Sequence, residues 1–287
     1  MSGALCISID LELAWGIWDR LDDAYLDNCA ELETRIVTSL LGLFERHDIS
    51  VTWAFVARLL ERDDTACART RHGERVWYAP HLIEAIRQSR VAHELGSHAY
   101  AHRYFSMLSR ADAEAELASA RRVHVAAGLP FDSLVFPRND IAHLDVVAAS
   151  GLRVYRGLDR GWFMTARRRG GKTAGRLAHL VDKALPIAPE SIEPTRRSDG
   201  LVELPSSLLL LGRAGMRRVI PPRLMVEKAK RGLAAARDSG KTFHLWFHPS
   251  NFYDEPDVQL AVLGDILAAA RASGVTISRM GDYAVAC

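Results

Sequence analysis

The sequence has few cysteines, and their spacing matches no common type of site. The chain contains four, and none belongs to a C-x-x-C pair: Cys6, Cys29, Cys67 and Cys287. This distribution argues against a zinc knuckle, a dithiol redox centre and a disulfide framework. We therefore expect reduced thiols and a cytoplasmic protein.

An excess of charge of one sign is also missing. The formal net charge is +2 at pH 7 with 25% charged residues, so no overall basic field indicates a nucleic acid or an anionic membrane as partner. The first ten residues, MSGALCISID, have no basic region, and their apolar run stops at Asp10. That run is too short for a signal peptide or a membrane span. We expect a small-molecule substrate and leave the oligomeric state open.

What the sequence does contain is a regular alternation of β-rich runs with helical patterns. The expected strands lie in residues 4–9, 49–55, 91–97, 133–137, 153–157, 201–205, 242–247 and 275–278. The expected helices lie in residues 31–47, 80–88, 109–127, 145–151, 222–240 and 257–274. Helices between strands favour parallel pairing, and 287 residues with 48% hydrophobic composition suit a single domain over residues 1–287.

A β/α barrel explains this alternation better than an open, doubly wound sheet. The open sheet is the fold of many nucleotide-binding proteins, but a phosphate-binding G-x-G-x-x-G or Walker pattern is absent. The alternation fails at about residues 160–200, where arginines, glycines and prolines are mixed. We expect a long insertion there.

Four of the apolar runs end in polar, reactive residues. In a β/α barrel the catalytic groups gather at the carboxyl ends of the strands, so these positions are the candidates for a site. They are Asp10 with Glu12, His98 with His102, Arg138 with Asn139, and His248.

The types and spacing of these residues indicate a metal centre. Asp10 and Glu12 are two apart, so on a strand both carboxylates point the same way. His98 and His102 are four apart, which places them on one face of a helix or helical turn. Two imidazoles and one carboxylate bind a divalent metal and leave positions open for water.

The ordered motifs also carry a resemblance. SIDLELAWG, HELGSHAYAH, VFPRN, LVELPSS and FHLWFHPSNF resemble, from about residue 5 to 280, the successive motifs of the polysaccharide deacetylase (NodB-homology) family. The resemblance implies a distorted (β/α)7 barrel and one divalent metal, usually Zn²⁺. It implies that Glu12, His98 and His102 bind the metal.

The same resemblance implies the catalytic roles. Asp10 would be the general base, His248 the general acid, and Arg138 the residue that orients the base. The family more often has two adjacent aspartates, whereas this chain has Asp10-Leu11-Glu12, which leaves open which carboxylate is the ligand. Its arginine usually precedes its prolines, but Arg138 follows Pro137.

Four further residues stand in or beside the motif strands and are candidates for lining the substrate pocket, with core packing as the alternative: Trp15, Asn139, Glu203 and Trp246. The other histidines are expected to lie outside the metal site. His244 should lie on the same side of its strand as His248 but deeper in the barrel.

We expect a metal-dependent deacetylase that removes an N-acetyl group, or less readily an O-acetyl group, from an intracellular sugar or activated sugar. Two alternatives remain open: a cyclic ureide or imide hydrolase of the same fold, and a catalytically silent carbohydrate-binding barrel. Residues 165–198 are rich in arginine and lysine, including Arg167, Arg168 and Arg169. They form either a solvated loop or a lid that holds an anionic part of the substrate.

Overall fold

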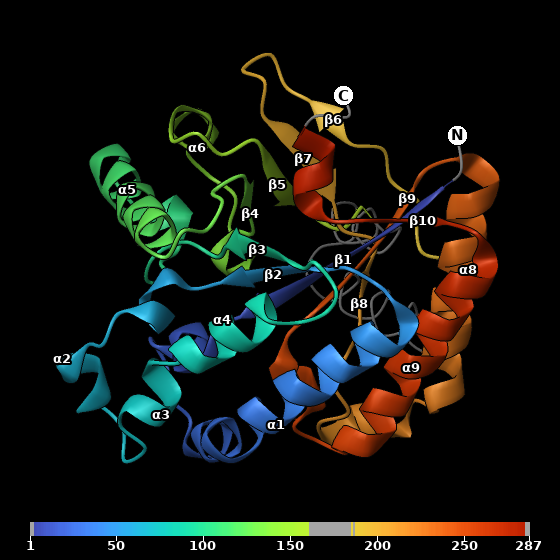
Figure 1. Cartoon of the computed structure of the whole chain (residues 1–287), viewed down its shortest axis with the longest axis horizontal. Coiled ribbons are helices and arrows are strands. Elements are labelled where there is room, and N and C mark those ends of the chain that lie inside the picture. The colour runs from blue at the N-terminus through green and yellow to red at the C-terminus, as the bar shows by residue number, and fades with distance from the viewer. Residues whose placement is uncertain (1–2, 161–184, 186, 285–287) are drawn as a thin grey trace, which may run out of the picture.

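The computed structural model describes residues 3–160, 185 and 187–284, and its strands form one curled sheet at the centre of the chain (Figure 1). The strands are β1 (Ala4–Leu11), β2 (Thr52–Phe55), β3 (Glu94–Ser97), β4 (Ser133–Leu134), β5 (Val154–Gly157), β6 (Thr195–Arg196), β7 (Val202–Pro205), β8 (Leu208–Leu209), β9 (Thr242–Phe247) and β10 (Thr276–Ser278). Their order is β6-β7-β5-β4-β3-β2-β1-β9-β8, with β10 beside β1. All of these pairs are parallel except β6–β7.

The expected distorted barrel is found in a partly open form. Among the described strands, none joins β8 to the β6–β7 edge. A single antiparallel bridge, from Ile192 to Thr242, links the segment before β6 to the start of β9. Most of the insertion expected at about 160–200, including Arg167, Arg168 and Arg169, lies outside the described residues, so the lid hypothesis stays a prediction.

The helices cover the sheet on its outer side. They are α1 (Asp23–His47), α2 (Asp64–Cys67), α3 (Glu74–Trp77), α4 (Pro80–Arg87), α5 (Arg110–Ala126), α6 (Leu144–Ala149), α8 (Pro222–Ser239) and α9 (Pro256–Ser273). Figure 1 shows α8 and α9 side by side at one end of the sheet, and α5 and α6 at the other. Within the described residues, no helix is both long and apolar enough to cross a membrane.

Helix α1 begins at Asp23 rather than at residue 31, where the apolar pattern alone would start it. The side chain of Asp22 caps the helix by accepting a hydrogen bond from the backbone N–H of Tyr25 at 2.8 Å. Leu26 and Cys29 are buried in this added part. Together with α4, α8 and α9, the helix packs the largest hydrophobic core against the sheet.

Strand β1 is central to the sheet. One of its edges pairs with β9, while the other pairs with β10 over Ala4–Cys6 and with β2 over Ser8–Leu11. Every residue from Leu5 to Leu11 is buried. Because parallel strands point the same way, the residues that follow β1, β3 and β9 all lie at one end of the barrel.

Candidate metal and catalytic site

Three predicted ligands meet at this end of the barrel. Glu12 follows β1, and His98 follows β3. One carboxylate oxygen of Glu12 lies 3.3 Å from Nε2 of His98 and 2.9 Å from Nε2 of His102. One donor atom from each of the three residues lies within 4.8 Å of the others, so the three can hold one ion.

The backbone conformation that brings the two histidines together differs from the one that their spacing suggests. We expected one face of a helix or helical turn, but residues 98–104 contain neither. Ala99 and His102 instead have positive φ angles of 63° and 56°, and these two left-handed residues turn the loop back on itself. The rings of His98 and His102 are thereby brought to 4.9 Å between centroids.

A buried carboxylate on α5 holds this loop in place. Glu116 accepts hydrogen bonds from the backbone N–H groups of Tyr100 and Ala101, at 3.1 and 2.7 Å. Its side chain is buried, and burial raises its pKa. The sequence gives no local sign of this contact, because Glu116 lies on an ordinary amphipathic helix.

The donor atoms fit a divalent cation. Nδ1 of His98 donates to the carbonyl oxygen of Val135 at 2.8 Å. Nε2 is therefore unprotonated, and its lone pair can bind a metal. Both ring nitrogens of His102 are buried and lack a well-aligned hydrogen bond within the described residues. Burial lowers the pKa of His102 and favours the neutral form that binds metals. Burial acts to raise the pKa of Glu12, but His248 and His102 outweigh it and hold that pKa well below its usual value.

Asp10 is paired with an arginine that sequence reasoning missed. Arg156, at the end of β5, donates to Oδ1 and Oδ2 of Asp10 at 2.6 and 2.7 Å. The side chains are 0% and 3% exposed, so both charges are removed from water. Burial acts to raise the pKa of Asp10, but the Arg156 guanidinium outweighs it and the pKa is lowered. Asp10 is therefore kept ionised and fixed in orientation.

A chain of hydrogen bonds continues behind Arg156. Nδ1 of His244 donates to the carbonyl oxygen of Pro205 at 3.0 Å, so its Nε2 accepts from the Ser8 hydroxyl at 2.9 Å. The Ser8 oxygen in turn accepts from Nη1 of Arg156 at 3.1 Å. Burial lowers the pKa of His244 to about 3, which keeps it neutral. His244 thus lies deeper in the barrel than His248, as expected.

The role expected for Arg138 requires a correction. Arg138 lies in a turn after β4 with a φ of 57°, and its Nη2 donates to the carbonyl oxygen of Gly16. The same Nη2 lies 3.4 Å from Oδ1 of Asp19. The guanidinium that contacts Asp10 is that of Arg156, not that of Arg138. Its neighbour Asn139 does reach the site, because Oδ1 of Asn139 accepts from Nη2 of Arg156 at 3.0 Å.

His248 lies between the two acidic residues. Its Nε2 is 3.5 Å from Oδ2 of Asp10 and 3.7 Å from Oε1 of Glu12. The side chain is 23% exposed, whereas Asp10 is almost fully buried. A molecule entering from solvent therefore meets His248 before Asp10.

The remaining candidates differ in how they meet the site. Trp15 is only 4% exposed and donates to the carbonyl oxygen of Trp77 at 3.0 Å, which is core packing. The centroid of the Trp246 ring lies 4.2 Å from Cζ of Arg156, and this cation–π contact helps to hold the guanidinium in place. Glu203, on β7, lies 3.3 Å from Arg160.

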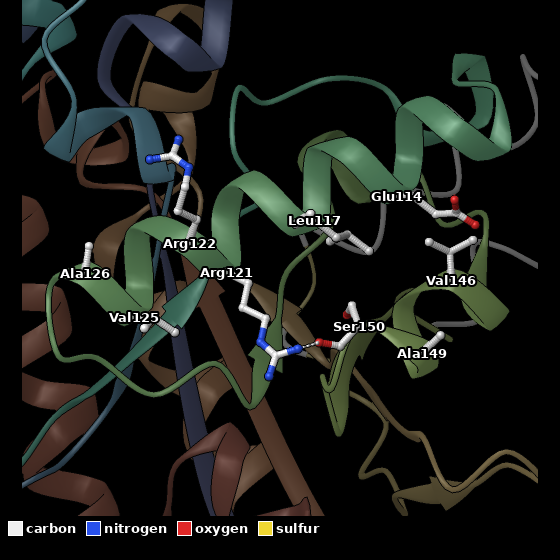
Figure 2. Close-up of a pocket in the computed structure, with 10 residues that line it drawn as sticks. Glu114, Leu117, Arg121, Arg122, Val125, Ala126, Val146, Ala149 and Ser150 are labelled. Carbon is white, nitrogen blue, oxygen red and sulfur yellow. Dashed lines mark hydrogen bonds between the residues drawn. The ribbon is translucent and has the colours of Figure 1, made fainter.

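A wide apolar groove lies away from these residues, between α5 and α6 (Figure 2). It has a volume of about 690 Å³, and it is lined by residues such as Leu117, Val125 and Val146. Arg121 reaches from α5 toward the end of α6 and donates to the carbonyl oxygen of Ser150 at 3.3 Å, as Figure 2 shows. None of the candidate site residues lines this groove.

Comparison with known proteins supports the resemblance seen in the sequence. Residues 20–145 match the sequence model of the polysaccharide deacetylase family. This part contains His98 and His102 but not Asp10, Glu12 or His248. No curated protein matches the sequence.

Solved structures share the fold over nearly the whole chain. A Mycobacterium smegmatis protein named as a polysaccharide deacetylase has 16% identity and a TM-score of 0.64, with 98% of this chain and 88% of that chain covered. One from Pseudomonas aeruginosa PAO1 has 15% identity and a TM-score of 0.65, with coverage of 98% and 89%. The PuuE allantoinase has 15% identity and a TM-score of 0.65, with coverage of 98% and 88%. At these identities the likeness shows the (β/α)7 fold.

Proposed function

We propose, from a polysaccharide deacetylase match over residues 20–145 and a fold shared with proteins of that name, that this chain is a metal-dependent deacetylase. Its substrate would be an N-acetylated, or less readily O-acetylated, sugar or sugar-containing small molecule. The observation that carries the proposal is the contact of His248 with Asp10 and Glu12 beside a Glu-His-His cluster. A location in the cytoplasm stays a prediction.

Each residue of the site would have a separate role in amide hydrolysis. Glu12, His98 and His102 would hold the cation, because both oxygens of Asp10 are already engaged by Arg156. A divalent ion such as Zn²⁺, when bound, polarises an acyl carbonyl and lowers the pKa of water.

Asp10 is placed to accept the proton of the attacking water, and Arg156 keeps it ionised for that step. His248 is placed to give a proton to the departing nitrogen, since it is the more exposed of the two and stands 3.5 Å from Asp10. The products would be acetate and a free amine.

The test is acetate release by the metal-loaded protein from a panel of N-acetyl and O-acetyl sugars. His248→Ala should keep its metal and lose roughly 10²- to 10⁴-fold in kcat, the usual contribution of a positioned acid. His102→Ala should lose both metal and turnover. The exposed His81 offers a matched control, because His81→Ala should change neither. An His248→Ala protein as active as the parent on an amide substrate would refute the assigned acid.

The fold shared with an allantoinase keeps a second candidate open, namely hydrolysis of a cyclic ureide or imide. Ring opening without acetate release, tested in the same panel, would favour it. Metal and sugar binding without turnover of any substrate would instead favour the silent carbohydrate-binding barrel. The complete set Asp10, His248 and Arg156 argues against that outcome, because a binder needs no proton donor or acceptor.

A further inference from the structure

A second pocket lies at the same end of the barrel as the metal cluster. It has a volume of about 280 Å³, and its walls come from the connections that follow β1, β2 and β3. The indole N–H of Trp18, one of its walls, donates to the carbonyl oxygen of His102 at 3.0 Å. Arg103, another wall, is the residue next to His102. The pocket is thus attached to the loop that carries the predicted ligands.

The walls of this pocket carry more positive than negative charge. Three arginines and a single carboxylate line it, namely Arg58, Arg69, Arg103 and Asp63. Asp63 is already engaged, because it pairs with Arg58 and accepts the backbone N–H groups that cap α2. Arg103 is 3.6 Å from Asp112, a long and half-exposed pair.

Arg69 has the least compensated charge of the three. Its Nη2 donates to the carbonyl oxygen of Trp18 at 2.6 Å, and it forms no ion pair within the described part of the chain. Its guanidinium is 5.5 Å from the ring of Trp77, and that of Arg58 is 4.6 Å from the ring of Trp15. Aromatic faces hold guanidinium groups in place without neutralising their charge. With three arginines against one carboxylate, the pocket has a net positive charge that favours an anion.

We propose that this pocket binds the phosphate group of a phosphorylated N-acetyl sugar. Guanidinium groups form paired, charge-assisted hydrogen bonds with phosphate oxygens. The volume of about 280 Å³ can hold a phosphate together with part of the sugar, and it lies just below the roughly 300 Å³ at which sites for whole drug-sized ligands begin. The proposal rests on the proposed deacetylase function, and it narrows the substrate to a sugar phosphate or nucleotide-linked sugar rather than a neutral polymer.

The activity test compares three substrates: N-acetylglucosamine, its 1-phosphate and its uridine diphosphate conjugate. We expect kcat/KM to be at least about 10-fold higher for a phosphorylated substrate, the effect of one charge-assisted hydrogen bond. Arg69→Gln and Arg103→Gln should each reduce this preference several-fold, mainly through KM. The better of the two phosphorylated substrates shows whether the phosphate is a monoester or part of a nucleotide.

The matched control is Arg121→Gln. Like Arg69, Arg121 is exposed and donates to a backbone carbonyl oxygen, but it lies in the groove between α5 and α6 (Figure 2). It should leave the preference unchanged. The proposal fails if the parent shows no preference, if Arg69→Gln changes all three substrates by the same factor, or if Arg121→Gln acts as Arg69→Gln does.

A binding test separates this proposal from the proposed function. Inorganic phosphate is titrated into metal-loaded parent, Arg69→Gln and Arg121→Gln proteins, with the metal content measured in each. Weaker phosphate binding in Arg69→Gln alone, at equal metal content, supports the pocket even if no acetate is released from any substrate. Equal binding by all three proteins overturns it, because the phosphate would then bind elsewhere, for example at the metal.

Discussion

Arg156 and Asp10 form an ion pair that is almost fully buried, with side chains 0% and 3% exposed. Breaking such a pair leaves one charge buried without its partner. We predict that Arg156→Gln lowers the free energy of unfolding by about 3 kcal/mol and lowers kcat while metal binding persists. Urea unfolding, metal analysis and steady-state kinetics measure the three effects.

Arg138→Gln is the control for this prediction. Arg138 is partly buried and contacts Gly16 and Asp19, so its loss should cost about 1 kcal/mol. A similar loss of stability and kcat in both variants would mean that Arg156 has no special relation to Asp10.

Glu33, on α1, is a buried acid that the proposed reaction does not use. Burial raises its pKa from 4.5 to about 7, although the hydrogen bond from the Tyr253 hydroxyl at 2.6 Å acts in the opposite direction. The folded state therefore holds this proton more tightly than the unfolded state, so stability should fall as the pH rises from about 4.5 to 7.

Glu33→Gln removes that titration while keeping a hydrogen-bond acceptor for Tyr253. We predict that the variant is more stable than the parent at pH 8, by an amount on the order of 3 kcal/mol or less, and that the advantage disappears at pH 4. Denaturant unfolding at several pH values measures this. Parallel stability curves for the two proteins would contradict it.

At the scale of the residue, the sequence predicted the groups that end an apolar run, because that position alone places them at the barrel's carboxyl end. Asp10, Glu12, His98 and His248 were selected as candidates in this way, and the structure brings them together. Arg156 was missed because it lies within the expected strand RVYRG and does not follow it. Its role depends on Asp10 of β1, which its side chain contacts across the barrel. Local sequence patterns do not reveal contacts between strands that are far apart in the sequence.

At the scale of the element, the loop from His98 to His102 depends on α5 for its shape. Glu116 accepts two of its backbone N–H groups, and with Ala in its place those groups would lack their partners. We predict that Glu116→Ala weakens metal affinity by roughly 10- to 100-fold, as loss of an outer support does at other metal sites. Competition with a chelator measures the affinity.

Glu114→Ala is the matched control, since Glu114 is exposed on the same helix and pairs with Arg110. Its metal affinity should equal that of the parent. Equal affinities in Glu116→Ala and the parent would show that the loop keeps its shape without α5.

The elements themselves were largely predictable. The strand over residues 242–247 and the helices α8 and α9 were expected within one residue of their observed bounds. The helical reading of the H-x-x-x-H spacing was wrong, because Ala99 and His102 adopt left-handed conformations that no pattern of residue types requires. The short β6 and β8 were also missed, since two-residue strands show no periodicity.

For the molecule as a whole, the predicted metal would join the ends of two strands, because Glu12 follows β1 while His98 follows β3. A ligand that binds only the folded state stabilises it by about 2.7 kcal/mol at 100 times its Kd. We predict that chelation lowers Tm by several degrees, at about 2–4 °C per kcal/mol for a chain of this size class. His102→Ala should show no such shift, and an unchanged Tm in the chelated parent would contradict the site.

The position of β1 has a consequence for protein synthesis. This strand is synthesised before the other described strands, yet its N-terminal half pairs with Thr242 of β9 and Thr276 of β10. At roughly 5–20 residues per second, those partners emerge tens of seconds later. Until then the apolar side chains of β1 lack their native partners, and we expect the nascent chain to be prone to aggregation. A chain released before residue 242 would lack both partners and should aggregate rather than fold.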